Sequence, residues 1–192
     1  MTESTVKPLR ADAQRNRERL LAAAGELFSE QGTDVSLEAV AARAGVGIGT
    51  LYRNFPNRDA LVEAAYRTEV AHLCDAAREL LADHAADVAL EQWMDRFVTY
   101  TGAKRGMAGA LQSMAGKDDI YSDSKEQIRT AIDTLLCAGV ESGTLRADVQ
   151  PDDVRRAMTA IWNISDGEEF RAQADTLIRI IVDGLRHGCT PQ

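Results

Sequence analysis

The chain has 192 residues, of which 45% are apolar and 27% charged, and a formal net charge of −8, which is typical of an ordinary globular protein. Its cysteines, Cys74, Cys137 and Cys189, are too widely spaced for a disulfide framework or a Cys-x-x-Cys metal knuckle, and no apolar run approaches the roughly 18 residues of a membrane span. We therefore expect a cytoplasmic protein with no metal, no cofactor and no membrane partner.

The negative charge is unevenly distributed along the chain. Residues 1–60 carry eight Lys and Arg against eight Asp and Glu, whereas residues 61–192 carry fourteen against twenty-two. Within the neutral first part the basic residues form two clusters, which are Arg10, Arg15, Arg17 and Arg19, and Arg43, Arg53 and Arg58. Such clusters are able to face a phosphate backbone while the acidic remainder stays away from it.

Apolar residues recur at three- and four-residue spacing along most of the chain, which predicts an all-α fold. The expected helices of the first part are at about 12–31, 37–44, 47–55 and 58–82. Those of the second part are at about 89–104, 107–115, 122–142, 152–165 and 169–187, which makes about nine in all. The expected ends are marked by residues that favour caps and stops, namely Gly32, Ser36, Gly45, Asn57, Gly143 and Pro151.

The segment Ala44–Pro56, AGVGIGTLYRNFP, admits two interpretations. A phosphate-binding loop needs G-x-G-x-x-G after a strand, or G-x-x-x-x-G-K-[ST], but Thr50 stands where the third glycine is required and a capped helix precedes. A helix-turn-helix needs two short helices joined by a tight turn, with small residues where they cross. Ala41 and Ala42 are small at that crossing, and Gly45 suits the turn. The helix-turn-helix interpretation is therefore preferred.

Residues 12–62 resemble the N-terminal domain of the TetR/AcrR family of bacterial transcriptional regulators. The resemblance is carried by LLAAAGELFSEQG, VSLEAVAARAGV and GTLYRNFPNRDAL, in the family's order and spacing. It implies a three-helix DNA-binding domain over residues 1–60, linked by a long helix to a helical ligand-binding and dimerisation domain over residues 61–192. Residues 89–187 fit that second domain by length and helix count, with some likeness to its SbtR-like subset.

The resemblance also implies which residues contact DNA. Phosphate contacts fall on Ser36, Thr50, Tyr52, Asn54 and Arg58, and base contacts fall on Ile48, Gly49 and Arg53. By residue type alone, Arg53 is more readily explained as an ordinary solvated surface arginine. Its place on the exposed face between Tyr52 and Asn54 favours base contact.

Two positions depart from the family's pattern. Gly47 replaces the Ser or Thr of many members and offers no side-chain cap, and Asn54 stands where others often have His. Each glycine within a short helix costs roughly 1 kcal/mol relative to Ala, so this helix is expected to be soft until DNA is bound. Gly49 either permits close approach of the backbone to the groove or is a tolerated weak point, and the sequence leaves both interpretations open.

Bulky apolar residues concentrate in the second part of the chain, where both tryptophans and four of the five methionines lie among glycines. Such residues at helical spacing build a core more often than a pocket. Met and aromatic walls are nevertheless what a cavity for an apolar small molecule requires. The expected ligand-binding residues are Trp93, Met94, Phe97, Tyr100, Met107, Leu111, Met114, Met158 and Trp162. The expected effector is a small apolar molecule.

The last two expected helices carry an apolar stripe. In the resembled family these helices form a four-helix dimer interface, and two-fold pairing also lets two helix-turn-helix units read the half-sites of a palindrome. The expected interface residues are Val154, Ile161, Ile178, Ile181, Val182 and Leu185. The alternative for some of them is burial within the monomer.

Nothing in the sequence forms a catalytic constellation. His72, His84 and His187 are dispersed, and there is neither a Gly-x-Ser-x-Gly elbow nor a metal-ligand spacing. We therefore expect a non-enzymatic, homodimeric repressor that an apolar molecule releases from a palindromic DNA operator. The alternative is a helical small-molecule-binding protein that no longer acts at operators, and activation in place of repression is also open.

Overall fold

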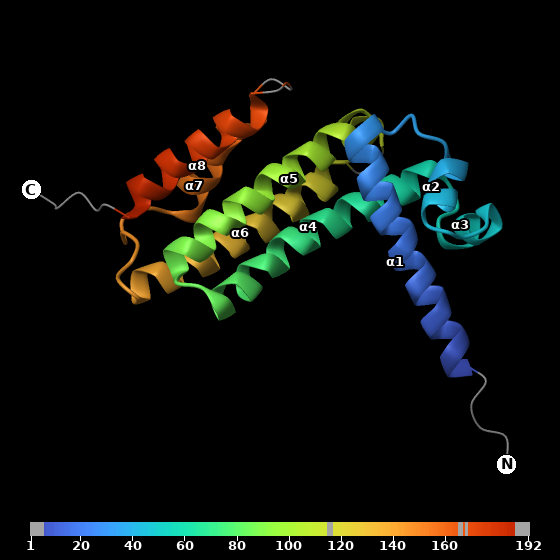
Figure 1. Cartoon of the computed structure of the whole chain (residues 1–192), viewed down its shortest axis with the longest axis horizontal. Helices are drawn as coiled ribbons and strands as arrows, with labels where there is room; N and C mark the ends of the chain where they lie inside the picture. The colour runs from blue at the N-terminus through green and yellow to red at the C-terminus, as the bar shows by residue number, and fades with distance from the viewer. Residues whose placement is uncertain (1–5, 115–116, 165–166, 168, 187–192) are drawn as a thin grey trace, which may run out of the picture. The chain divides into compact units, whose positions relative to one another are not determined.

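The computed structural model describes residues 6–114, 117–164, 167 and 169–186, and within them the fold is all-α, as the sequence predicts (Figure 1). The helices are α1 (Val6–Gln31), α2 (Leu37–Arg43), α3 (Ile48–Asn54), α4 (Arg58–Asp83), α5 (Ala86–Ser113), α6 (Lys117–Glu141), α7 (Pro151–Trp162) and α8 (Phe170–Arg186). No helix in these ranges is long and apolar enough to cross a membrane.

The helix ends are formed by the residues that the sequence marks. Gly32, Gly45 and Gly143 adopt φ angles of 74°, 65° and 72° after α1, α2 and α6, a left-handed conformation that glycine reaches at little cost. The Ser36 hydroxyl and the Asn57 side chain each accept a hydrogen bond from the backbone N–H three residues on, at 3.1 and 2.8 Å. The helix ends predicted at these positions are confirmed.

Three helices differ from the prediction. Helix α1 begins at Val6 instead of residue 12, and α6 begins at Lys117 instead of about residue 122. The helices expected at 89–104 and 107–115 are one continuous helix, α5, so that the described residues form eight helices instead of about nine. Gly106 lies within α5, where its backbone closely approaches α1: an added Cβ would lie 2.7 Å from the Phe28 carbonyl carbon. The glycine permits close helix packing and does not interrupt the helix.

The chain divides into two compact units, each built from two segments. The first unit comprises Met1–Glu69 and Gly102–Lys117, and the second comprises Val70–Thr101 and Asp118–Gln192. Helices α4 and α5 therefore contribute turns to both units. The functional domain boundary expected at residue 60 stays a prediction; in the structure that residue lies inside α4 and inside the first unit.

The core of the first unit is built where α1 packs on α2 and α3. The predicted apolar stripe of α1 supplies Leu20 and Phe28, both fully buried, and α3 contributes Leu51. Ion pairs join the outer side of this contact, since the Arg43 guanidinium lies 3.0 Å from the Glu26 carboxylate. The helix-turn-helix is thus held on α1 by both apolar burial and a surface ion pair.

The core of the second unit centres on Trp93 of α5. Its indole is fully buried, and its Nε1–H donates a 2.7 Å hydrogen bond to the Leu73 carbonyl of α4. Arginines at both ends of α8 tie that helix to α5: Arg186 lies 2.8 Å from the Asp87 carboxylate, and Arg171 pairs with Asp95. These contacts fix the orientation of α8 on α5.

Candidate nucleic-acid interface

Helices α2 and α3 form a helix-turn-helix in the first unit. The chain reverses at Gly45, whose N–H donates to the Ala42 carbonyl at 3.0 Å, and the Val46 N–H donates to the Ala41 carbonyl at 3.0 Å. These two bonds satisfy carbonyls that the end of α2 would otherwise leave without partners. The turn therefore sets the angle between α2 and α3 through the backbone.

One side of α3 is anchored in the core and the other faces solvent. Leu51 is fully buried and Phe55, which caps the helix, is 1% exposed. The opposite side carries four of the predicted DNA-contacting residues, all exposed, which are Ile48, Gly49, Tyr52 and Arg53. A short helix with an exposed polar face held by two buried anchors has the form of a major-groove recognition helix.

Arg53 lies on this exposed face, and a hydrogen bond to its own helix sets the direction of its side chain. Its Nε–H donates to the Gly49 carbonyl at 3.0 Å. An arginine has five N–H donors, and two of them suffice to pair with the O6 and N7 atoms of a guanine. The side chain is thus oriented along α3 while donors remain for a base edge.

The predicted phosphate-contacting residues differ in their exposure and in the hydrogen bonds that they already make within the chain. Ser36 is exposed, while Thr50 and Asn54 are half-buried, and the Asn54 amide donates to the Thr50 carbonyl at 2.8 Å. Arg58 donates from Nη1 to the carbonyls of Thr33 and Val35, the latter at 2.7 Å. Arg58 therefore also braces the loop between α1 and α2, a role that the sequence did not indicate.

The two glycines of α3 lie in open space. Gly47 occupies the N-cap position with no side-chain cap hydrogen bond, and an added Cβ there would meet no atom within 4 Å. At Gly49 the nearest atom to an added Cβ would be the Arg53 Nη2, at 4.0 Å. Packing within the chain thus gives no reason for either glycine.

Two arginines of α1 contact the helix-turn-helix, and the sequence did not indicate either contact. The Arg17 guanidinium lies 4.5 Å from the centre of the Phe55 ring, and its Nη1 donates to the Asn54 carbonyl at 3.4 Å. Arg19 Nη2 donates to the Gly45 carbonyl at 3.3 Å. The sequence shows only a basic cluster here; its contacts with the end of α3 and with the turn depend on how α1 crosses α2 and α3.

Comparison with known proteins assigns the family. The tetR family of bacterial regulatory proteins matches residues 20–65, and the C-terminal domain of SbtR-like transcriptional regulators matches residues 85–187. A crystal structure of the TetR transcriptional regulator SCO0520 from Streptomyces coelicolor is 45% identical, with a TM-score of 0.83 over 90% of this chain and 99% of that one. The chain belongs to the TetR family of transcriptional regulators. It is therefore a DNA-binding regulator and not an enzyme.

Two further transcriptional regulators are similar to this chain. A TetR regulatory protein from Mycobacterium vanbaalenii is 34% identical, with a TM-score of 0.78 over 94% of this chain and all of that one. An HTH-type transcriptional regulator of Staphylococcus aureus strain USA300 is 41% identical over 54 residues, which are 28% of this chain and 29% of that protein. The similarity to this curated regulator thus covers less than a third of its length.

The predicted effector-binding residues of this TetR chain are divided between the two units. Met107 and Leu111 belong to the first unit, whereas Trp93 belongs to the second. In the second unit the rings of Trp93, Phe97 and Tyr100 follow one another along α5, with centres 6.2 and 5.6 Å apart. Six of the nine predicted residues are buried, namely Trp93, Met94, Tyr100, Met107, Leu111 and Met158, and Phe97, Met114 and Trp162 are half-buried.

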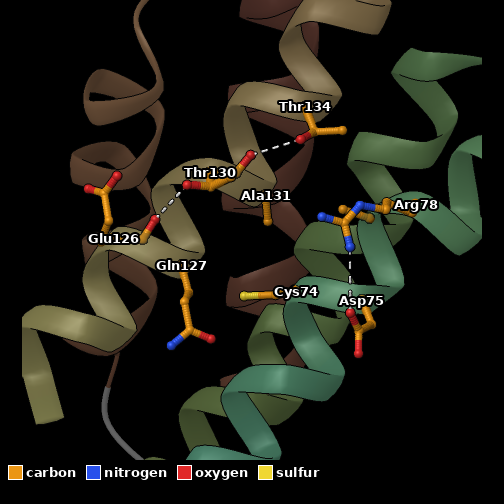
Figure 2. A pocket seen from close by; sticks show the side chains of 9 residues that line it. Cys74, Asp75, Arg78, Glu126, Gln127, Thr130, Ala131 and Thr134 are labelled. Carbon is orange, nitrogen blue, oxygen red and sulfur yellow. Dashed lines mark hydrogen bonds and ion pairs between the residues drawn. The ribbon is translucent and has the colours of Figure 1, made fainter.

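A pocket of about 260 Å³ lies elsewhere in the second unit, between α4 and α6 (Figure 2). Its lining combines charged, polar and small side chains, which are Cys74, Asp75, Ala77, Arg78, Glu126, Gln127, Thr130, Ala131 and Thr134. The Thr130 and Thr134 hydroxyls donate to carbonyls of their own helix, at 3.0 and 2.9 Å. Burial raises the pKa of the Cys74 thiol to about 11, with the Asp75 carboxylate adding to the rise. This pocket is more polar than the cavity that the sequence predicts.

The predicted dimer-interface residues lie mostly inside the second unit. Val154 and Ile161 of α7 and Ile178, Val182 and Leu185 of α8 are buried within the chain, while Ile181 is half-buried. The outer side of α8 instead exposes Ile180, which keeps 62% of its surface in solvent. A pocket of about 550 Å³ at the amino-terminal half of α8 is lined by Ile164, Glu169, Ala172, Gln173, Thr176 and Leu177. Ile180 was not among the predicted interface residues, because periodicity alone does not separate the two apolar sides of α8.

Proposed function

We propose that this TetR-family chain is a homodimeric, ligand-responsive repressor that binds a palindromic operator through α3. The exposed side of α3, anchored by buried Leu51 and Phe55, carries this proposal. In it, Arg53 reads a base edge together with Ile48 and Gly49, and the Tyr52 hydroxyl bonds a phosphate. Ser36, Thr50 and Asn54 add further phosphate contacts. Arg58 contributes a phosphate contact while it braces the preceding loop.

Pairing of two chains is part of the proposal, because one helix-turn-helix reads too few base pairs to specify an operator. The support is the outer face of α8, where exposed Ile180 lies one turn from half-buried Leu177 and beside Ile181. In this proposal the second chain covers Ile180 and the pocket that Leu177 lines on the same helix. Gly184, exposed one turn further on, allows a second helix to approach closely. The buried apolar residues of α7 and α8 fix the orientation of this face, because the two helices pack against each other.

The effector part of the proposal rests on the second unit. An apolar molecule is proposed to enter beside the Trp93, Phe97 and Tyr100 rings, whose packing it would have to open. Helices α4 and α5 continue from the second unit into the first, so a change in their second-unit packing is connected through continuous helix to the DNA-binding unit. Release from DNA follows only if the effector binds the DNA-incompetent state more tightly, by roughly 1–3 kcal/mol in a typical case.

The DNA-binding proposal is tested by in vitro selection from a randomised duplex library with the full-length chain. The recovered duplex is then titrated by fluorescence anisotropy at 50 and 200 mM KCl. We expect selective binding that weakens steeply with salt. Replacing Arg53 by Ala should cost about 1–3 kcal/mol and relax preference at one base pair per half-site. Replacing Arg58 should weaken binding to all sequences alike, and Arg129→Ala on α6 serves as the control.

Failure to enrich any sequence, together with the absence of salt-dependent binding, would contradict the repressor and support the alternative of a binding protein without an operator. Dimerisation is tested separately by analytical ultracentrifugation. Ile180→Asp should shift the chain from dimer to monomer, whereas Val140→Asp, at a 40% exposed valine of α6, should leave the mass unchanged. Equal masses for wild type and Ile180→Asp would place the interface elsewhere.

A further inference from the structure

We propose that the pocket between α4 and α6 binds a small zwitterionic α-amino acid, with the carboxylate of the ligand on Arg78 and its ammonium group on Asp75. This pocket is called the α4–α6 site below. None of its lining residues belongs to the predicted effector-binding set. The α4–α6 site is therefore distinct from the apolar effector site of the proposed function.

Two facing helix surfaces within the second unit form the α4–α6 site. Residues 74, 77 and 78 of α4, and residues 127, 130, 131 and 134 of α6, recur at three- and four-residue spacing, which places each set on one face of its helix. The most buried lining residues are small, since Ala77 is 1% and Ala131 5% exposed, and a volume of about 260 Å³ remains between the helices. Pockets for drug-sized molecules have roughly 300–1,000 Å³, so this site admits only a small ligand.

Asp75 and Arg78 supply two opposite charges, one turn apart on α4. Their Oδ1 and Nη1 atoms are 3.8 Å apart, which is too long for a hydrogen bond, and both side chains are largely exposed. Figure 2 shows the Arg78 guanidinium and the Cys74 thiol directed from α4 towards α6. Ion pairs between exposed side chains contribute little to stability. A ligand with both a carboxylate and an ammonium group therefore exchanges one weak pair for two charge-assisted hydrogen-bonded pairs.

The other titratable groups that line the site leave this charge balance unchanged. Arg129 donates two hydrogen bonds to the Glu126 carboxylate, at 2.7 and 2.9 Å, and thereby lowers the pKa of Glu126. Burial raises the pKa of the Cys74 thiol to about 11, while the Asp75 carboxylate raises it further and the Arg78 guanidinium lowers it. The thiol is thus neutral at pH 7. A neutral zwitterion matches this balance, whereas a simple anion or cation leaves one charge of the α4 pair without a new partner.

The α6 side of the site adds hydrogen-bonding groups. The Thr130 and Thr134 hydroxyls already donate to carbonyls of α6, at 3.0 and 2.9 Å, so their oxygens offer only acceptor lone pairs to a ligand. The exposed Gln127 amide provides both donors and an acceptor. An ammonium group has three N–H donors to place. The acceptors on α6 therefore favour an amino acid over a ligand that is only a carboxylate.

The test measures binding to the full-length chain in the absence of DNA. The standard L-amino acids are screened at about 5 mM by thermal shift, because a ligand that binds the folded chain stabilises it. Each amino acid that raises the melting temperature is titrated by isothermal calorimetry. We expect the preferred one to bind with a dissociation constant below about 1 mM. Its deaminated acid and its decarboxylated amine, which each lack one charge, should bind at least tenfold more weakly.

Two variants locate the binding site. Arg78→Gln and Asp75→Asn each remove one charge of the α4 pair and should raise the dissociation constant of the preferred amino acid roughly 10- to 100-fold. Asp75→Asn should bind the deaminated acid no more weakly than wild type does, because that probe has no ammonium group. Arg156→Gln on α7 is the matched control: Arg156 is also exposed and pairs with an aspartate three residues earlier. This control should bind like wild type.

Three results would overturn the α4–α6 site as an amino-acid site. They are the absence of any amino acid with a dissociation constant below about 10 mM, equal affinities of wild type and Arg78→Gln, and binding of the deaminated acid or the amine as tight as that of the amino acid. None of these results would contradict the proposed function, because operator binding is measured with a DNA duplex and with different variants.

Discussion

Gly106 offers a sharp test of how α5 packs against α1. A methyl group added there would lie well inside van der Waals contact of the Phe28 carbonyl oxygen, 2.7 Å from its carbonyl carbon and 3.3 Å from the Ser29 Cα. All three atoms belong to the backbone of α1, so no side-chain rotation relieves the overlap. The two helices must separate, and overpacking of this kind costs typically 1–3 kcal/mol.

The same helix provides the control. Gly109 lies three residues further along α5, is exposed, and has no atom within 4 Å of an added Cβ. There alanine should gain the usual helix-propensity benefit of roughly 0.5–1 kcal/mol. At Gly106 that gain is set against the overlap, and because the obstructing atoms are backbone we expect a net loss of about 2 kcal/mol. The two substitutions should therefore change stability in opposite directions.

Urea denaturation of the full-length variants at one fixed protein concentration measures the difference, because any dimerisation makes stability depend on concentration. The midpoint for Gly106→Ala should fall and that for Gly109→Ala should rise, with the m-value unchanged in both. A Gly106→Ala chain as stable as wild type would refute the close approach of α5 to α1. A rise of the urea midpoint in both variants would show that helix propensity alone decides the effect of alanine at both positions.

Three further perturbations probe the DNA-binding unit and the second core. Gly49→Ala should raise the free energy of unfolding by up to about 1 kcal/mol. If the variant binds the selected duplex more weakly in fluorescence anisotropy, Gly49 permits close approach of the backbone to DNA. If binding is unchanged, Gly49 is a tolerated weak point of the helix. Trp93→Phe removes the donor to the Leu73 carbonyl and should cost about 1–3 kcal/mol in urea denaturation, with an unchanged midpoint counting against this bond. The pKa of Cys74 is raised from 9.0 to about 11 by burial, so above pH 9 the unfolded chain loses this proton first and stability falls as pH rises towards 11. In thermal melts between pH 9 and 11, Cys74→Ser should lose less stability than wild type as the pH rises. The same loss in both chains would contradict the raised pKa of Cys74.

The local features of the DNA-binding unit were accessible from the sequence because each depends on a few neighbouring residues. Ser36 and Asn57 cap their helices through short polar side chains, and Gly45 takes the left-handed turn conformation that other residues avoid. The same signals identified α3 as the exposed helix after the turn. The continuity of α5 was not accessible, because a glycine in a sequence is equally compatible with a helix break and with a close helix crossing.

What the sequence determined by itself is therefore the all-α class, the helix-turn-helix and most helix ends, since backbone conformation and apolar periodicity act over a few residues. Tertiary structure alone decided which side of α8 is buried and which exposes Ile180, that Met107 and Trp93 belong to different units, and that Arg17 stacks on Phe55. These outcomes depend on which helices meet and at what angle. Contacts between residues distant in the chain set that geometry, and no periodicity within one helix encodes it.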